Sequence, residues 1–562
     1  MGILPNKSKS VSKKFIKALD KIKHESAKSD SVVILLEKGE YHFYDTESVK
    51  KEYYISNHDQ TAFKYVGIDL TGMKNLTFDG NGADLIFHGR MLPIALTESN
   101  NCTLKNFSID FHRPQMMQVK ILSNDGSNGM TYKIDDNSNY KLNEKGQLVL
   151  FDKTWENVPI TGMAFEPDTK RIVYTTRDLN IQTVGSKEIA KGVFHSPRWK
   201  DSKLEKGHKI AMRTYFRPAP GIFLHKNNNT KLENIKVHFA EGMGLLAQLC
   251  TNIDLNGFCV SLKEGHNRYF TTQADATHFS SCKGTINSFN GLYENMMDDA
   301  INVHGTYLKI IKVVDKHTVI GQYMHHQAYG FDWGFVNDTV QFVQSNTMDK
   351  IGKVNKIVDI KPYDKSEVFG AKQYIIKLQN ELSQEMNYIQ SVGVENLTWT
   401  PKVNFCNNVV RNNRARGVLF STPQRVVVRE NLFDHTSGSA ILLCGDCNGW
   451  FETGSCTEVI IENNKFVNAL TSLFQFTNAV ISIYPEIPNL AGQKGYFHGG
   501  KKGAIVIQNN EFHTFDAPIL YAKSVNGIVF KNNKIIMNND YKPYHWNKSR
   551  FLLERVTNAE ID

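Results

Sequence analysis

The chain has 562 residues, 41% of them hydrophobic and 22% charged, which is ordinary for a soluble globular protein. A formal net charge of +9 arises from 66 basic and 57 acidic residues, without a block of Arg and Lys interleaved with aromatic residues. We therefore expect no nucleic-acid partner. No apolar stretch is long enough for a transmembrane helix, so we also expect no membrane span.

The start of the chain, MGILPNKSKSVSKK, lacks the apolar segment of a secretion signal. We nevertheless expect a bacterial protein that is secreted, periplasmic or anchored at the cell surface, with its native leader outside this sequence. Eight cysteines are too few for a dense disulfide framework. Cys444, Cys447 and Cys456 are interpreted as buried or loop thiols, because no second CxxC or HxxxH completes a zinc site. The sequence gives no indication of the oligomeric state.

An amphipathic helix is predicted near the start, from Ser10 to His24. Phe15, Leu19 and Ile22 fall on one face of this segment. The apolar run from Val32 to Leu36 follows it and reads as a strand. A repeat protein needs such a helix to cover its open end, so we expect a short N-terminal cap.

Much of the remaining chain repeats at an interval of 23 residues. Segment LENIKV, starting at Leu232, matches LNGFCV, starting at Leu255, at this offset. Asparagine pairs recur at the same step or at a larger one, and their members are Asn408, Asn431, Asn464, Asn510 and Asn533. Fixed periods of about 20 to 50 residues are typical of repeat architectures, in which each unit buries its apolar face against its neighbours.

The repeating units read as strands rather than helices. Short β-branched runs such as Val426–Val428 and Val459–Ile461 are separated by Asn, Gly and Ser, with no long stretch of helical period. Asn tolerates the left-handed backbone conformation of a turn, and stacked amides hydrogen-bond to one another. The sequence therefore predicts an all-β, right-handed parallel β-helix with about 23 residues per coil.

Two segments break the repeat and instead show hairpin-like turn signals. We interpret them as inserted small β-barrel or sandwich modules. The predicted organisation is a cap with the first coils at 1–114, the first module at 115–218, central coils at 219–306, the second module at 307–401, and C-terminal coils with a closing tail at 402–562.

Three acids are predicted to meet in the central coils. Asp275 precedes Asp298 by 23 residues, one period, and Asp299 follows directly. Neighbouring coils lie about 4.8 Å apart, so these carboxyl groups should be in contact and raise at least one pKa. That arrangement suits glycosidic cleavage, where one carboxyl protonates the leaving oxygen and another activates water. Solvated turn residues and a calcium site are the competing interpretations.

Further residues near the acid-bearing face are candidates for binding sugar. Trp450 and Glu452 lie in an insertion between coils, and Trp333 lies in the second module; each indole is as readily a core residue as a sugar platform. Arg90 either reaches the site or pairs with a buried acid. The remaining candidates for hydroxyl contacts are Gln273, His278, His304 and Arg416.

Longer stretches of the chain resemble glycoside hydrolase family 110. They are FDGNGADLIFHGRMLPI from Phe78, NFSIDFHRP from Asn106, TTQADATHFSSCKG from Thr271 and YENMMDDAINVHGTY from Tyr293, together with ILLCGDCNGWFETG and VIIENNKF. The resemblance runs from about Ile34 to the C-terminal end. It implies a β-helix with two inserted β-barrel domains and removal of terminal α-1,3-linked galactose, with inversion and without a metal or other cofactor.

By the same resemblance Asp275, Asp298 and Asp299 are the catalytic acids. We assign Asp298 as general acid and the other two as the water-activating pair. Blood group B or linear α-galactosyl glycans are the expected substrates, and the sequence does not choose between fucosylated and linear forms. The alternatives are a polysaccharide hydrolase of the polygalacturonase type, which needs a basic groove, and a noncatalytic glycan-binding β-solenoid. A lyase is a weaker alternative.

Overall fold

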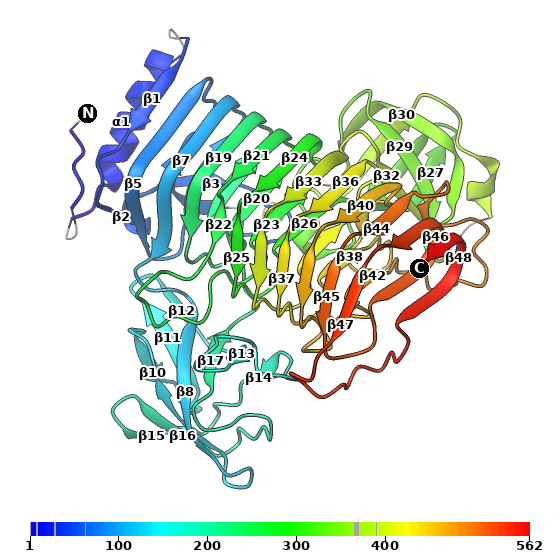
Figure 1. Ribbon diagram of the computed structural model, residues 1–562. Helices are drawn as coiled ribbons and strands as arrows, with labels where there is room; N and C mark the ends of the chain where they lie inside the picture. The colour runs from blue at the N-terminus through cyan, green and yellow to red at the C-terminus, as the bar shows by residue number, and fades with distance from the viewer. Residues whose placement is uncertain (1, 7–8, 27–29, 62, 365–369, 389) are drawn as a thin grey trace.

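The computed structural model describes residues 2–6, 9–26, 30–61, 63–364, 370–388 and 390–562. Its largest element is a sheet of 32 strands in which nearly all neighbours pair in parallel. These strands wind into a β-helix that runs from the N-terminal to the C-terminal end (Figure 1). Within the described residues no helix is long and apolar enough to cross a membrane. The predicted fold class is confirmed.

Three ladders of parallel strands form the walls of the β-helix. The first, which carries the site, contains β6 (Leu92–Thr97), β18 (Ile222–His225), β20 (Leu245–Gln248), β23 (Thr277–Ser280), β26 (Ile301–Thr306), β35 (Val418–Phe420), β38 (Ile441–Leu443), β42 (Ile481–Ile483) and β46 (Leu520–Lys531). The second contains β5 (Leu76–His88), β7 (Asn100–Phe111), β19 (Asn228–Val237), β21 (Thr251–Asn256), β24 (Lys283–Phe289), β33 (Pro401–Cys406), β36 (Arg425–Arg429), β40 (Glu458–Glu462) and β44 (Ile505–Gln508). The third contains β22 (Cys259–Val260), β25 (Leu292–Glu294), β34 (Val409–Arg411), β37 (Leu432–Asp434), β41 (Lys465–Val467), β45 (Glu511–Thr514) and β47 (Lys534–Met537).

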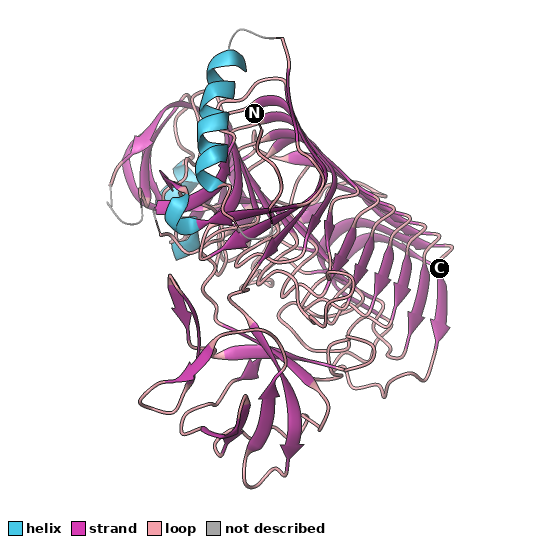
Figure 2. Ribbon diagram, turned by 90° about the vertical axis from the view of Figure 1, so that its left-hand side faces the viewer, coloured by secondary structure: helices cyan, strands magenta, loops and turns pink. Residues whose placement is uncertain are grey.

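Helix α1 (Ser12–Ser26) covers the N-terminal end of the coils (Figure 2). Its Phe15, Leu19 and Ile22 are buried in the same apolar core as the strands, so the amphipathic pattern has the predicted effect. The first strands follow it, and a 3₁₀ turn η1 (Asp45–Glu47) lies among them. Their bounds are β1 (Val32–Leu35), β2 (Glu40–Tyr44), β3 (Val49–Glu52) and β4 (Phe63–Asp69).

The predicted period is the actual strand register over most of the coils. Leu232 pairs with Leu255, an offset of 23 residues. Ile301 aligns with Val418 and Val418 with Ile441, which confirms the expected equivalence of the Asp298–Asp299 segment with the coil around Ala440. Apolar side chains on successive coils thus stack on one another and form one continuous core.

A ladder of asparagines runs along one turn of the coils. The side chains of Asn408, Asn431, Asn464, Asn510 and Asn533 hydrogen-bond to the next in line, with Nδ2 to Oδ1 distances of 2.9–3.3 Å. Each follows a residue in the left-handed region, with φ between 54° and 59°. The first residue of each pair therefore makes the turn, and the second satisfies buried polar groups of the neighbouring coil.

Replacing Asn464 by Ala is expected to lower the free energy of unfolding by about 2–3 kcal/mol, because buried groups lose their partners. Its Nδ2 donates to Val428 O at 2.9 Å, and its Oδ1 accepts from Asn431 N at 3.0 Å. Chemical denaturation measures the change. Asn228→Ala is the matched control, because Asn228 is exposed and its amide contact lies on the surface. Equal effects of the two changes would contradict a structural ladder.

The first inserted module is a seven-stranded antiparallel sheet with a smaller three-stranded sheet beside it. It hangs from the coils as a separate body of strands (Figure 2). The strands are β8 (Met117–Asn124), β9 (Met130–Ile134), β10 (Tyr140–Leu142), β11 (Leu148–Asp152), β12 (Trp155–Asn157), β13 (Thr161–Phe165), β14 (Leu179–Asn180), β15 (Lys187–Ala190), β16 (Val193–Ser196) and β17 (Lys209–Arg213).

The second inserted module is a closed barrel of antiparallel strands. The predicted hairpin is present, since Val313 of β27 pairs with Val319 of β28. The strands are β27 (Leu308–Asp315), β28 (Thr318–Gln322), β29 (Thr339–Gln344), β30 (Lys350–Pro362), β31 (Gln373–Leu378) and β32 (Val392–Asn396), with 3₁₀ turns η2 (His326–Ala328) and η3 (Gln384–Asn387).

The coils continue further toward the C-terminus than the sequence suggested. The tail around Phe551 was expected to close the end, but β48 (Phe551–Ile561) pairs in parallel with β46 and adds another rung. Two short strands, β39 (Glu452–Thr453) and β43 (His498–Gly499), lie in long connections between coils. β39 pairs antiparallel with the end of β26 and so holds Glu452 beside the acid-bearing coil.

Candidate active site

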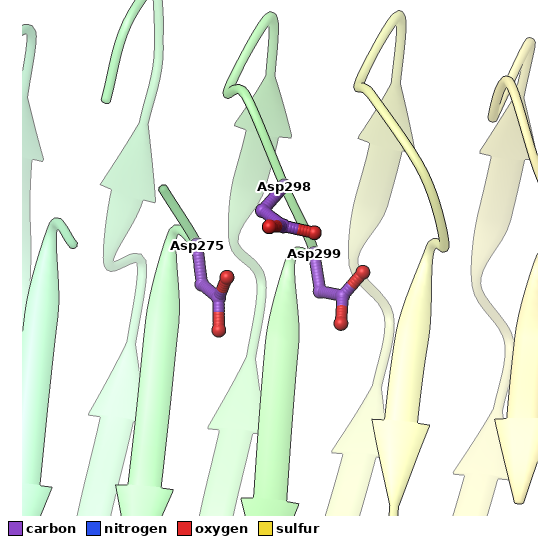
Figure 3. A group of neighbouring side chains, drawn as sticks. All are labelled: Asp275, Asp298 and Asp299. Carbon is purple, nitrogen blue, oxygen red and sulfur yellow. The ribbon is translucent and has the colours of Figure 1, made fainter. Parts of the chain in front are cut away.

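The three predicted aspartates lie together at the starts of neighbouring strands. Oxygen atoms of Asp275, Asp298 and Asp299 all lie within 4.8 Å of one another. Figure 3 shows Asp275 before one strand, Asp299 before the next, and Asp298 between them. The arrangement arises because a parallel ladder places corresponding positions of successive coils side by side.

The register at this point corrects one expectation. Thr277 pairs with Ile301, an offset of 24 rather than 23 residues, and Ala276 N donates to Asp299 O at 2.8 Å. Asp299, not Asp298, is therefore the residue stacked on Asp275. Asp298 reaches the cluster from the turn that precedes the strand. One extra residue in this coil is too small a change to detect from repeat spacing alone.

Asp299 is buried and is held by an arginine of the next coil. Arg416 N donates to Asp299 Oδ1 at 3.2 Å and Arg416 Nη2 donates to Asp299 Oδ2 at 2.9 Å. Burial raises the pKa of Asp299, and the Arg416 guanidinium offsets part of that rise. Burial alone would lower the pKa of Arg416, but the surrounding carboxylates raise it above its usual range. Arg416 therefore remains a fixed positive charge at the base of the cluster.

Asp298 is the most accessible of the three acids, with 23% of its side chain exposed. Arg414 Nη1 lies 3.4 Å from its Oδ2, while Asp298 Oδ1 has no hydrogen-bond partner. Arg414 is itself held by Asp178 of the first module through contacts of 2.6 and 2.8 Å. The free oxygen of Asp298 is thus presented to the space above the cluster.

Asp275 is buried and bonded to a histidine on the same strand. Its Oδ2 lies 2.7 Å from His278 Nδ1. Burial, and then the neighbouring charge of Asp298, raise the pKa of Asp275 well above its usual range. Burial, followed by repulsion from His304, lowers the pKa of His278 well below its usual range. A carboxyl group whose pKa approaches neutrality suits proton transfer to or from a reacting group.

A cavity of about 570 Å³ opens above the aspartates. Its volume lies within the range of about 300–1,000 Å³ that small-molecule sites occupy. Both inserted modules contribute to its wall, the first through the segment after β17 and the second through the turn at η2. The charged and aromatic lining residues are Asp59, Arg213, Tyr215, Phe216, Arg217, Asp275, His278, Asp298, His325, His326, Arg414, Arg416, Asp446, Trp450, Glu452, Phe474 and Phe476.

Trp450 is presented to this cavity by a tight loop. Asp446 accepts hydrogen bonds from the backbone N–H groups of Asn448, Gly449 and Trp450 at 2.6–2.9 Å, which fixes the loop. The Trp450 side chain lies beside His325, with ring centroids 4.6 Å apart, and the residue is 37% exposed. An accessible indole at the cavity wall suits stacking against the apolar face of a sugar.

The predicted binding residues fall into two groups. Gln273, His278, Arg416, Trp450 and Glu452 line the cavity. Trp333 does not: it is 2% exposed in the core of the second barrel, and its indole N–H donates to Thr306 O at 2.8 Å. The expectation for Trp333 is therefore wrong, because its indole packs into the barrel instead of leaning over the groove.

The two histidines also differ from the expectation of hydroxyl contacts. His278 uses Nδ1 for Asp275 and Nε2 for His304 Nε2, which lies 2.8 Å away. His304 is 2% exposed and does not line the cavity. Neither ring therefore offers a free nitrogen to a sugar. Arg90 takes the second of its two predicted roles, since it pairs with buried Glu241 at 2.6 Å.

The three cysteines near the site lie in separate apolar clusters. Cys444 lines the cavity beside Leu419 and Leu442, Cys447 packs against the second barrel, and Cys456 belongs to the main core. All are buried free thiols. Burial raises the pKa of Cys447 to about 12, so its thiol is protonated and unreactive at neutral pH.

Several residues of the site were not found from the sequence. Arg414 carried a detectable signal, because it lies two residues before Arg416 on the coil that follows the acid pair. Arg213, Arg217 and His325 carried none, since they lie in or beside the inserted modules, outside the repeat. Their positions depend on how each module packs against the coils.

A larger cavity of about 700 Å³ lies elsewhere, between the first module and the early coils. Its charged lining includes Asp110 and Arg268, which already form an ion pair at 2.8 Å. Among the described residues, only the three aspartates above form a carboxylate group close enough to share a ligand. Chemistry therefore favours the smaller cavity as the active site.

Clustered carboxyl groups at the floor of a cavity with aromatic walls are the equipment of a glycoside hydrolase. Two family models match the inserted modules: GLAA-B beta-barrel domain I over residues 117–210 and GLAA-B beta-barrel domain II over residues 318–388. Relatives match the whole chain. A protein of Phocaeicola vulgatus named Alpha-1,3-galactosidase B is 57% identical over 100% of this chain and 95% of its own length.

A Bacteroides fragilis protein of the same name is 56% identical over 100% of this chain and 94% of its own length. Another protein of B. fragilis, named Alpha-1,3-galactosidase A, is 30% identical over 97% of this chain and 88% of its own length. The chain belongs to this α-1,3-galactosidase family, glycoside hydrolase family 110, as its sequence motifs indicated.

Solved structures give weaker matches. The A-module of a mannuronan C-5 epimerase from Azotobacter vinelandii is 7% identical, with a TM-score of 0.41 over 100% of this chain and 97% of its own. Similarity at this level informs neither the activity nor the site.

Proposed function

We propose that this enzyme removes nonreducing terminal α-1,3-linked galactose from glycans, with inversion at the anomeric carbon. The observation that carries the proposal is the Asp275, Asp298 and Asp299 cluster at the floor of the cavity. Loops from both modules surround that cavity, which favours a chain end over the middle of a polymer. The names of the relatives supply the linkage.

We assign the general acid to Asp298, because its Oδ1 is free of hydrogen bonds and its side chain is the most accessible of the three. Both oxygens of Asp299 accept from Arg416, so Asp299 is poorly placed to give up a proton. Asp275 has a raised pKa and receives the proton of the attacking water, with Asp299 helping to hold that water.

The charges of the cavity favour a neutral sugar over a uronate. Four arginines line it, but they face five lining acids. Arg414 and Arg416 are already paired with Asp178 and Asp299. The groove therefore lacks the unpaired positive charge that a polygalacturonase substrate needs. The same two guanidinium groups lie where they would repel a calcium ion at the carboxylate cluster, which favours a metal-independent site.

The stereochemical outcome is proposed from the family resemblance. The carboxyl oxygens lie within 4.8 Å of one another, whereas inverting enzymes commonly separate theirs by about 6.5–9.5 Å. A third carboxyl group provides another way to hold water, between Asp275 and Asp299. NMR of the product at early times, before mutarotation, decides the question: a β-galactose product supports inversion, and an α-galactose product contradicts it.

The activity itself is tested with an α-1,3-galactosyl disaccharide and with p-nitrophenyl α-galactoside, each with and without EDTA. We expect release of galactose from both and no loss on chelation. Polygalacturonate is the negative control substrate. Loss of activity in EDTA would contradict the metal-independent mechanism, and cleavage of polygalacturonate alone would contradict the galactosidase assignment.

The natural substrate is proposed to be a blood group B or linear α-galactosyl glycan. A panel of fucosylated and linear α-1,3-galactosides, compared by kcat/KM, distinguishes the two. Such substrates lie outside the cell, so a secreted, periplasmic or surface-anchored location remains part of the proposal.

Replacing Trp450 by Ala is expected to raise KM by about 10-fold with little change in kcat, because a stacking platform binds the ground state and the transition state alike. Steady-state kinetics on the disaccharide measure the change. Trp546→Ala is the control, since Trp546 is 56% exposed and lies outside the cavity lining. An unchanged KM in Trp450→Ala would exclude the platform role.

A further inference from the structure

A chain of hydrogen bonds runs from Asp275 into the wall behind the site. Asp275 Oδ2 lies 2.7 Å from His278 Nδ1, His278 Nε2 lies 2.8 Å from His304 Nε2, and His304 Nδ1 lies 2.6 Å from Gly305 O. His304 Nε2 also lies 3.4 Å from Glu452 Oε1. Both imidazole side chains are 1% exposed, so neither exchanges protons freely with solvent.

The hydrogens of this chain can be assigned by donor and acceptor rules. A carbonyl oxygen only accepts, so His304 Nδ1 carries a hydrogen toward Gly305 O. One hydrogen lies between the two Nε2 atoms, and one lies between His278 Nδ1 and Asp275. Burial lowers the pKa of His278 well below its usual range, so His278 is the neutral ring. The remaining proton therefore belongs to Asp275 or to His304.

Two forms satisfy every hydrogen bond. In the first, Asp275 is a carboxylic acid that donates to His278, and both rings are neutral. In the second, Asp275 is a carboxylate that accepts from His278 Nδ1–H, and His304 is an imidazolium that donates to His278 and faces the carboxylate of Glu452. The forms interconvert when two hydrogens move along the two short bonds, with no net gain or loss of a proton.

We propose that the His278–His304 pair is a positioning device that keeps Asp275 ionised as the base of the reaction by storing its proton on His304, beside Glu452. The inference rests on the proposed role of Asp275. It resolves a physical difficulty: a buried carboxylate is costly to form, and an internal imidazolium two hydrogen bonds away offsets that cost without opening the site to water.

The catalytic step then balances. Asp275 takes a proton from water as the water oxygen bonds to the anomeric carbon, the glycosidic C–O bond breaks, and Asp298 protonates the leaving oxygen. One proton has moved from Asp298 to Asp275, and it returns through solvent when the products leave. The histidine pair keeps its own hydrogens throughout the cycle, so neither ring touches the substrate.

Other charged groups around the pair are accounted for. Asp298 and Arg416 face it from the same ladder of strands, Arg217 from the exit of the first module, and Glu452 from the connection after β38. His58, from the loop between β3 and β4, is buried, and burial lowers its pKa well below the usual range. Glu452 is the negative group in direct contact with His304, which makes it the stabilising partner of the imidazolium.

His304→Gln tests the proposal, because an amide still donates a hydrogen bond to His278 but cannot hold the extra proton. Asp275 then has to lose its proton to solvent in order to ionise. We expect the acidic limb of the kcat/KM profile to move to higher pH by about one unit or more, with KM little changed. Activity near neutral pH falls by about 10-fold or more and recovers at higher pH.

His498→Gln is the matched control, since His498 is equally buried but lies in the C-terminal coils. It should keep the wild-type profile. Glu452→Gln should move the acidic limb in the same direction as His304→Gln, because it removes the partner of the imidazolium. A profile for His304→Gln that superimposes on wild type, or an equal loss at every pH, would overturn the proposal.

NMR of nitrogen-labelled histidine gives a readout that does not depend on catalysis. We expect one buried ring with both nitrogens protonated near neutral pH in wild type, and its loss in His304→Gln. Neutral rings throughout would overturn the proposal. If wild type hydrolyses no α-galactoside, the proposed function fails while this measurement still reports on the pair. If wild type is active and the spectrum and profile ignore His304→Gln, only the inference about the histidines fails.

Discussion

Replacing Asp298 by Asn is expected to lower kcat/KM on an α-1,3-galactosyl disaccharide by about 10²–10⁴-fold, the usual contribution of a general acid. The loss on p-nitrophenyl α-galactoside should be much smaller, because a nitrophenolate leaves without being protonated. Asp275→Asn should reduce the rate on both substrates to a similar extent, since every substrate needs an activated water. The comparison separates the two roles within one experiment.

Two controls support that experiment. Asp254→Asn removes a coil aspartate outside the cavity and should keep full activity. Asp275→Asn should be at least as stable as wild type near neutral pH, because burial raises the pKa of Asp275 and its ionised form destabilises the fold. That advantage should disappear below the unfolded-state pKa of about 4, where Asp275 is protonated in both states. Equal losses of Asp298→Asn on both substrates would contradict its role as acid.

Replacing Arg416 by Met is expected to abolish turnover and to lower the free energy of unfolding by about 3–5 kcal/mol near neutral pH, as breaking a buried ion pair does. Arg416 donates to both oxygens of Asp299, which is 1% exposed. Without the guanidinium, Asp299 is a buried carboxylate with no charged partner bonded to it. Chemical denaturation of the two proteins measures the difference.

The pH dependence of that loss identifies its cause. Removing Arg416 raises the pKa of Asp299 further, so the stability of the variant is retained where Asp299 is protonated and lost as pH rises through that pKa. The deficit should therefore shrink in acid, and the double variant Arg416→Met/Asp299→Asn should recover part of it. Arg425→Met is the surface control and should cost less than about 1 kcal/mol, because Arg425 is 53% exposed beside Glu458. A pH-independent deficit would mean lost packing instead of an unpaired charge.

The repeating part of the fold could be predicted because each coil carries its own signal. Asn408 and Asn431 are 23 residues apart and are bonded in the structure, since the turn and the ladder depend only on local spacing. The same spacing brought Asp275 to the acid pair. It assigned the stacked partner to Asp298 instead of Asp299, because the coil between them holds 24 residues in the ladder register and nothing in the composition marks the extra one.

The rest of the site could not be predicted by the same argument. Trp333 and Trp450 look alike in the sequence, but one indole fills the barrel core and the other faces the cavity. His278 and His304 looked like separate sugar contacts, and they meet only because β23 and β26 are neighbours in the ladder. Burial and side-chain direction decide such cases, and neither is a property of one residue's place in a repeat.

The sequence by itself determined the β-helix, the two insertions, the family and the acid cluster. All of these follow from periodic spacing or from continuous motifs, which act through neighbouring coils. Only the tertiary structure decided the walls of the cavity, where Arg213 and His325 come from modules inserted far apart in the chain. The packing of those modules on the coils depends on contacts spread over long sequence separations, and no repeat records them.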